Sequence, residues 1–248
     1  MTDKKDVSHA PPGGAIARSA GTMVDSFLKQ ANRLGPVAGT AARPRLVFAL
    51  DATMSRQPTW DLACRVQSEM FEATSKIGGL SVQLVYFRGF DECRASRFVV
   101  EPRALTDLMA KIDCRGGQTQ IGRVLRHVRD EAGRAPVKAL VYVGDAMEEP
   151  IDDVCAAAGE LGLVGVKAFM FHEGHDPVAG GAFQEIARLT GGAYARFDAS
   201  APGALANLMR AAAAYASGGI AALQHLAASD GKARALLTSM QTPNARRS

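Results

Sequence analysis

Residues 46–55 have the sequence Leu-Val-Phe-Ala-Leu-Asp-Ala-Thr-Met-Ser, in which five apolar residues lead directly into a short acidic and hydroxyl-bearing segment. An apolar run without alternation predicts a strand that is buried on both faces, as in a parallel sheet covered by helices. The polar residues that follow mark the carboxyl end of that strand. Ligands of open α/β sheets bind beyond this end, so these polar residues are candidates for a binding site.

Similar segments recur along the rest of the chain. Apolar runs predict further strands, at 82–87, 97–100, 139–143, 166–171 and 193–197. Helical spacing of apolar residues predicts helices between them, at 59–77, 104–112, 121–133, 152–162, 180–190 and 203–216. Strands that alternate with helices predict a mainly parallel central sheet with helices on both faces. The expected fold class is therefore a three-layer, Rossmann-like α/β fold.

Composition shifts divide the chain into three parts. Residues 1–44 are expected to be a disordered or linker segment with a short helix at about 22–35, and residues 45–217 to form the α/β domain. Residues 218–248 are expected to be a C-terminal helical extension and basic tail, interrupted near 229–231. The leucines of this extension need an apolar cover from the domain, from the 22–35 helix or from a partner.

Charge and hydropathy exclude several classes of protein. The net charge of +4 comes from the ends, because residues 1–45 carry +4 and residues 230–248 carry +3, which leaves −3 for the rest. This distribution argues against a nucleic-acid-binding face. No apolar run approaches the length of a membrane helix, and the first residues do not resemble a signal peptide. We therefore expect a cytoplasmic protein that binds neither nucleic acid nor membrane.

Three groups of polar residues are expected to meet at the carboxyl edge of the sheet. They are Asp51-Ala-Thr53-Met-Ser55, the loop Gly116-Gly-Gln-Thr119-Gln-Ile121, and Gly144-Asp145 after a central strand. Carboxylate and hydroxyl oxygens are hard ligands that suit Mg2+. The two glycines allow the second loop to approach the first closely. Five such residues leave part of an octahedral shell open, for water or for a group from outside.

This pattern resembles the metal-ion-dependent adhesion site of von Willebrand factor A domains, which has Asp-x-Ser/Thr-x-Ser, a later Thr, and an Asp after a central strand. The resemblance covers about 170 residues. It implies that Asp51, Thr53, Ser55, Thr119 and Asp145 hold Mg2+, with Mn2+ or Ca2+ as substitutes, directly or through water. It also implies a protein-binding module, not an enzyme, in which an acidic residue of a partner completes the metal shell. Bacterial intracellular members often serve as adaptors or assembly factors, some with AAA+ ATPases.

Four further residues are candidates for contact with a partner at the same edge. Arg88 and Phe90 follow the second strand, and Glu148 and Glu149 follow Asp145. Aromatic and arginine side chains are favoured at binding hot spots. A packed loop for the first pair and a solvated loop for the second are the alternatives. Individually, Asp51, Ser55 or Thr119 could also serve as a simple helix cap.

Two other functions remain open at this stage. A Mg2+-dependent phosphoesterase or phosphotransferase of haloacid dehalogenase type also begins with a strand that ends in Asp. That family has a second Asp two residues later, where this chain has Thr53. The other alternative is a structural protein whose metal site is vestigial.

Overall fold

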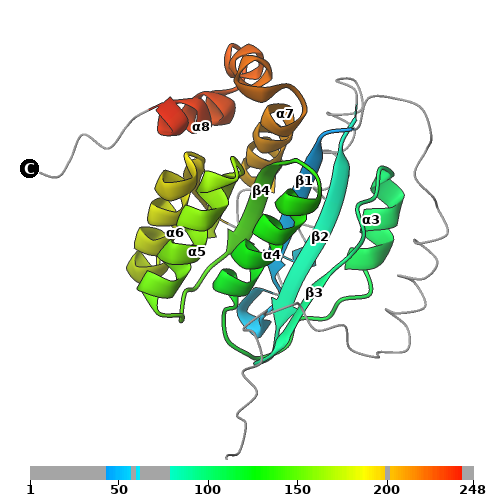
Figure 1. The fold of residues 1–248 in the computed structure, drawn as a ribbon, viewed down its shortest axis with the longest axis vertical. Coiled ribbons are helices and arrows are strands. Elements are labelled where there is room, and N and C mark those ends of the chain that lie inside the picture. Colours follow the sequence, from blue (N-terminus) through cyan, green and yellow to red (C-terminus); the bar gives the residue numbers. More distant parts are fainter. Residues whose placement is uncertain (1–42, 57–59, 62–78, 199–201, 242–248) are drawn as a thin grey trace, which may run out of the picture.

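The computed structural model describes residues 43–56, 60–61, 79–198 and 202–241. The expected helix at 22–35 and most of the expected helix at 59–77 lie outside these residues. The described part contains one six-stranded sheet in the order β3-β2-β1-β4-β5-β6 (Figure 1). Its strands are β1 (Arg45–Asp51), β2 (Ser81–Arg88), β3 (Glu92–Ala95), β4 (Val137–Gly144), β5 (Lys167–Glu173) and β6 (Ala193–Phe197).

The strand β1 lies inside the sheet, between β2 and β4, and pairs in parallel with both. The strands β5 and β6 continue the parallel part, and only β3 is antiparallel. Residues 46–51 are buried along their whole length. The prediction of a strand covered on both faces is confirmed.

Helices cover both faces of the sheet (Figure 1). They are α3 (Pro102–Met109), α4 (Ile121–Arg134), α5 (Ile151–Leu163), α6 (Pro177–Thr190), α7 (Pro202–Ala227) and α8 (Gly231–Gln241), with a short 3-10 helix η1 (Met54–Arg56) after β1. Buried residues of α4, α5 and α6 pack with one set of strand side chains, and those of α3, α7 and α8 pack with the alternate set. The alternation of side chains along each strand therefore supplies two apolar cores. The three-layer α/β prediction is confirmed.

The edge strand differs from the prediction. A strand was expected at residues 97–100, but β3 lies at Glu92–Ala95, and beyond it Val99 makes only an isolated bridge to Val82. The chain reverses at Gly89, whose φ of 61° is readily adopted by glycine, so that Glu92 lies opposite Arg88. The short edge strand alternates charged residues with Cys93 and Ala95, and for this reason an apolar-run criterion missed it.

The C-terminal helices are covered by the domain itself. Leu223 of α7 and Leu236 of α8 are fully buried, in the same core as Phe169 of β5. The helix α7 bends at Gly219, where φ is 66° and ψ is −156°. The predicted interruption near 229–231 is confirmed, because α7 ends at Ala227 and α8 begins at Gly231.

All the parallel strands end at the same edge, which is the lower edge of the sheet in Figure 1. Leu50 pairs with Val143, so Asp51 and Gly144 are the next residues on neighbouring strands. Across the other side of β1, Asp51 pairs with Phe87 of β2. The topology therefore brings the ends of β1, β2 and β4 together, although they are far apart in sequence.

Candidate metal centre

The segment after β1 folds back on the carboxylate of Asp51. The backbone amide of Thr53 donates a hydrogen bond to Asp51 Oδ1 at 2.8 Å, which is the geometry of an Asx turn. Asp51 is only 1% exposed. The turn brings the hydroxyl oxygens of Thr53 and Ser55 to 3.3 Å from each other. Three candidate ligand side chains are thus held by one short turn, and Asp51 is used locally without capping a helix.

Asp145 follows β4, next to the end of β1. Its side chain is half-buried, and its Oδ1 atom is enclosed without a hydrogen-bond partner among the residues that the structure describes. Burial of a polar atom without a partner costs free energy, commonly about 1 to 3 kcal/mol. A cation bound at this edge would offset this cost.

The loop before α4 is bonded to two other loops at this edge. The amide of Arg115 donates to the carbonyl of Ala52 at 3.0 Å, and the amide of Gln118 donates to the carbonyl of Gly89 at 3.1 Å. A Cβ atom on Gly117 would lie 2.1 Å from the carbonyl oxygen of Gly89, so no other residue fits there without a backbone shift. A Cβ on Gly116 would meet nothing within 4 Å. The close approach expected from the glycine pair is made by Gly117.

Thr119 is tied to the loop that carries Asp145. Its amide donates to Glu148 Oε2 at 3.1 Å, and its hydroxyl oxygen accepts from the amide of Glu148 at 2.9 Å. The hydroxyl therefore does not cap α4, and the helix has no capping bond from its N-cap residue, Gln120. Thr119 Oγ1 also forms a hydrogen bond with the carboxylate of Glu149, so its proton is engaged and one lone pair is left for a further partner.

Glu149 supplies the missing cap of α4 from a distant part of the chain. Its carboxylate accepts hydrogen bonds from the amides of Ile121 and of Gly122, the latter at 2.9 Å. Burial raises the pKa of Glu149, although these amide bonds oppose the shift. Both glutamates were expected as partner contacts or as members of a solvated loop. The structure gives each of them an internal bond, and only Glu148 is exposed.

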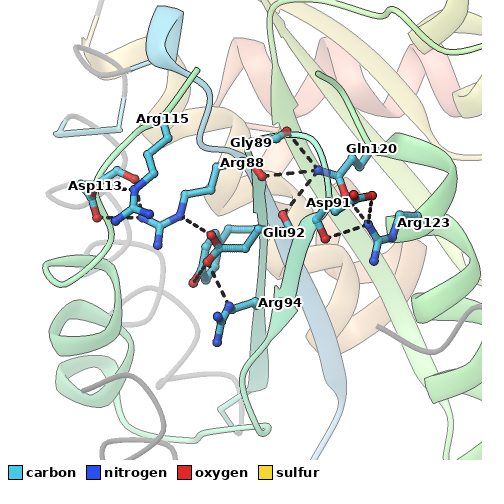
Figure 2. A network of polar contacts seen from close by, with 10 residues as sticks. Arg88, Gly89, Asp91, Glu92, Arg94, Asp113, Arg115, Gln120 and Arg123 are labelled. Carbon is cyan, nitrogen blue, oxygen red and sulfur yellow. Dashed lines mark hydrogen bonds and ion pairs between the residues drawn. The ribbon is translucent and has the colours of Figure 1, made fainter. Parts of the chain in front are cut away.

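Arg88 is the last residue of β2, and its side chain points toward Asp113 and Glu92 (Figure 2). Its side chain is buried, with Nε 3.0 Å from Glu92 Oε2 and Nη1 2.7 Å from Asp113 Oδ1. Phe90, at the tip of the hairpin, is 73% exposed. Of these two candidate contact residues, only Phe90 is exposed to solvent. Arg88 joins the hairpin to Asp113, which precedes the loop that contains Gly116 and Gly117 (the glycine loop).

The donor set suits a hard divalent cation. Asp51, Thr53, Ser55, Thr119 and Asp145 come from three loops at the carboxyl edge, and hydrogen bonds join these loops directly or through the β2–β3 hairpin. Within the described residues there is no group of three or more His, Cys, Asp or Glu that could hold a metal. Such a group would be expected for zinc. Two carboxylates with three hydroxyls fit Mg2+ better than a softer metal.

Solved structures similar to this one are von Willebrand factor A domains. A von Willebrand factor type A protein from Catenulispora acidiphila has a TM-score of 0.59 at 19% identity, covering 72% of this chain. The SpRpn10 VWA domain has a TM-score of 0.53 at 10% identity, covering 68% of this chain and 98% of that domain. This chain has the von Willebrand factor A (VWA) fold. An aerotolerance-related membrane protein from Bacteroides fragilis has a TM-score of 0.51 at 18% identity, covering 66% of this chain and 98% of its own.

These similarities describe the VWA fold and not the site. The matched part spans 44% of the Catenulispora acidiphila chain, so it is a portion of that protein. No protein-family model matches the sequence, and the search of curated proteins finds no match. No helix of the described part is long and apolar enough to cross a membrane.

Sequence reasoning missed three features of this edge. They are the capping of α4 by Glu149, the burial of Arg88, and the hydrogen bond from the side-chain nitrogen Nε2 of Gln120 to the carbonyl oxygen of Gly89, at 3.4 Å. The only sequence signal for the first was an α4 start that lacks Ser, Asp or Asn at its N-cap position. The free amides of the first turn of a helix need hydrogen-bond acceptors, and a side chain from a distant segment can supply them when the N-cap residue does not.

Proposed function

We propose that this VWA-fold protein binds another protein through a divalent metal, Mg2+ in the cell, held at a metal-ion-dependent adhesion site. Asp51, Thr53, Ser55, Thr119 and Asp145 hold the metal, directly or through water, with Mn2+ or Ca2+ as substitutes. When bound, the metal offers an open coordination position to a carboxylate of the partner. The proposed activity is binding and not catalysis, because the five-residue pattern contains no histidine or cysteine that could serve as a base or a nucleophile.

The observation that supports this proposal most directly is the enclosed Oδ1 atom of Asp145. It has no hydrogen-bond partner within the described residues, and it lies on the loop that is bonded to Thr119. Asp51, the other carboxylate, ends the neighbouring strand. A metal between these loops would give Asp145 Oδ1 the partner that its burial requires.

The site is also held in shape before any ligand arrives. The Asx turn at Asp51, the backbone contact of Gly117 with Gly89, and the paired bonds of Thr119 with Glu148 each restrain one of the loops. Restraint of this kind reduces the entropy that the chain loses when a ligand binds. The arrangement favours a functional site over a vestigial one.

The cellular role belongs to the same proposal. The protein acts in the cytoplasm as an adaptor or assembly factor, and an AAA+ ATPase system is the setting that the family resemblance suggests. The resemblance also suggests the bacterial intracellular type of VWA protein. The partner contributes an acidic residue to the metal.

The test captures partners of the tagged protein from its own cell lysate, in Mg2+ and in EDTA. Asp145→Asn is the variant, because it keeps the shape of the side chain and leaves the Asx turn of Asp51 intact. Asp107→Asn is the matched control, since Asp107 is an exposed carboxylate on α3.

A protein retained by the wild type and by Asp107→Asn in Mg2+, but lost in EDTA and with Asp145→Asn, is the expected result. Retention under every condition would overturn the metal-dependent proposal. Turnover on a panel of phosphoesters with Mg2+ would overturn the statement that the protein is not an enzyme. A thermal melt with and without Mg2+ separates an occupied site from a vestigial one, because ligand binding stabilises the native state.

A further inference from the structure

Large apolar side chains are exposed beside the proposed metal centre. Phe90 is 73% exposed at the tip of the β2–β3 hairpin, and Met54 is 62% exposed between Thr53 and Ser55. Ile151 and Val178 are exposed at the starts of α5 and α6, which follow β4 and β5 at the same edge. Exposed apolar residues thus follow four parallel strands in turn, on both sides of Asp51 and Asp145. We refer to these four residues as the apolar rim.

Hydrogen bonds and ion pairs tie the hairpin that carries Phe90 to α4 on one side and to Asp113 on the other (Figure 2). The side-chain nitrogen Nε2 of Gln120 donates to the carbonyl oxygen of Gly89 at 3.4 Å. The side-chain oxygen Oε1 of Gln120 accepts a 2.7 Å hydrogen bond from Arg123. Arg123 also donates to the carbonyl of Asp91 at 3.0 Å. The buried Arg88 adds ion pairs to Glu92 and Asp113. The residues on either side of Phe90 are therefore tied to α4 and to the glycine loop.

A braced and exposed aromatic side chain suits recognition. Exposure of its ring to water is unfavourable, and burial against a partner would remove this cost. The bonds of the neighbouring residues restrain the hairpin backbone that presents the ring. An interface anchor held in position before binding loses little conformational entropy on binding. Aromatic anchors commonly contribute a large share of binding free energy.

Exposed carboxylates lie around the apolar rim. They are Asp91, Asp113, Glu148, Asp152 and Asp153. Two of these carboxylates are balanced by neighbouring arginines, since Arg115 pairs with Asp113 at 2.9 Å and Arg123 lies 4.0 Å from Asp91. Glu148, Asp152 and Asp153, around the start of α5, form no ion pair among the described residues, so this part of the surface opposes a partner with many acidic residues and favours one with basic residues.

We propose that Phe90 and Met54 form the docking anchor for an extended partner segment in which a single carboxylate lies beside an apolar side chain and is flanked by basic residues. The carboxylate binds the metal, the apolar side chain packs on Phe90 and Met54, and the basic residues face the exposed carboxylates. This inference rests on the proposed function and adds the specificity of the partner to it.

The test uses an array of short synthetic peptides with a central Asp or Glu and varied flanking residues, probed with the full chain in Mg2+ and in EDTA. Phe90→Ser is compared with Leu163→Ser, because Leu163 is 90% exposed at the end of α5, on the opposite edge of the sheet. Phe90→Leu keeps an apolar side chain at the hairpin tip. Thermal melts of all variants confirm that they are folded.

The wild type is expected to retain, in Mg2+ only, peptides with an apolar neighbour and basic flanks, and to reject peptides with added acidic residues. Phe90→Ser is expected to weaken this binding at least about tenfold, Phe90→Leu less, and Leu163→Ser not at all. Mg2+-dependent binding that ignores the flanking residues and survives Phe90→Ser would overturn the inference alone. Absence of Mg2+-dependent binding in every sample would overturn the proposed function, and this inference with it. A dimer that Phe90→Ser dissociates would show that a second copy covers the apolar rim instead.

Discussion

Thr119 and Glu148 exchange two hydrogen bonds, in which the amide of each residue donates to a side-chain oxygen of the other, at 3.1 and 2.9 Å. The two residues are 29 positions apart in sequence. Their bonds hold the loop before α4 against the loop after β4. The candidate ligands Thr119 and Asp145 thus keep a defined relation to each other.

Replacement of Thr119 by valine tests this relation. Thr119→Val keeps the shape of the side chain but removes the oxygen that accepts from the amide of Glu148, and should lower the free energy of unfolding by about 1 kcal/mol. It should also abolish any stabilisation by Mg2+. Urea unfolding with and without Mg2+ measures both effects. Thr119→Ser retains the hydroxyl and should resemble the wild type both in the free energy of unfolding and in its increase by Mg2+. If Mg2+ stabilises Thr119→Val as much as the wild type, Thr119 is not a ligand.

The glycine loop offers a matched pair of substitutions. Gly117→Ala places a Cβ 2.1 Å from the carbonyl oxygen of Gly89, whereas Gly116→Ala places one in open space. The first should lower the free energy of unfolding by about 1 to 3 kcal/mol, as other overpacked sites do, and should weaken Mg2+ binding because the loops move apart. The second should change little. Calorimetric melting measures the stability of both variants. Similar losses of stability in the two would contradict the close contact of Gly117 with the carbonyl of Gly89.

The cap of α4 is testable through Glu149. Glu149→Ala leaves the amides of Ile121 and Gly122 without their acceptor and should lower the free energy of unfolding by about 1 to 2 kcal/mol. Glu101→Ala is the control, because Glu101 precedes α3 without making a capping bond. Chemical denaturation of both variants is the measurement. A loss no greater than that of the control would mean that Glu149 does not stabilise α4.

The ion pairs of Arg88 predict a dependence of stability on pH. Burial raises the pKa of Glu92, but the bonds and charges of Arg88 and Arg94 outweigh it and lower the pKa overall. The bond from Arg115, opposed by a small burial effect and aided by Arg88, lowers the pKa of Asp113 to about 2. Both carboxylates therefore stabilise the fold above their ordinary pKa values, and this stabilisation is lost as the pH falls through the lowered values.

Arg88→Met should accordingly lower the free energy of unfolding near neutral pH, by roughly 2 kcal/mol, since one partner of a largely buried ion pair is removed. Its stability should then fall less than that of the wild type between the ordinary carboxyl pKa values and about pH 2. Urea unfolding over this pH range measures how steeply the free energy of unfolding changes with pH in the wild type and in Arg88→Met. Parallel pH curves would show that the carboxylates are not coupled to Arg88.

Much of the site could be inferred from local sequence. The apolar run before Asp51 and the run before Gly144-Asp145 placed both carboxylates at strand ends, because a buried strand has a characteristic composition that needs no knowledge of its neighbours. The edge strand β3 could not be found in this way, since its four residues alternate between charged and small apolar side chains and its position depends on the turn at Gly89. Edge strands are buried on fewer sides and leave a weaker pattern.

The sequence by itself determined the fold class, the strand ends and the chemical types of the candidate ligands, because these depend on composition and periodicity within short segments. Only the tertiary structure decided that Glu149 caps α4, that Arg88 is buried while Phe90 is exposed, and that Thr119 is joined to Glu148. Each of these relations links residues that lie far apart in the chain or depends on how the hairpin packs. Such contacts form only when the whole sheet is assembled, so the pattern of a short segment does not predict them.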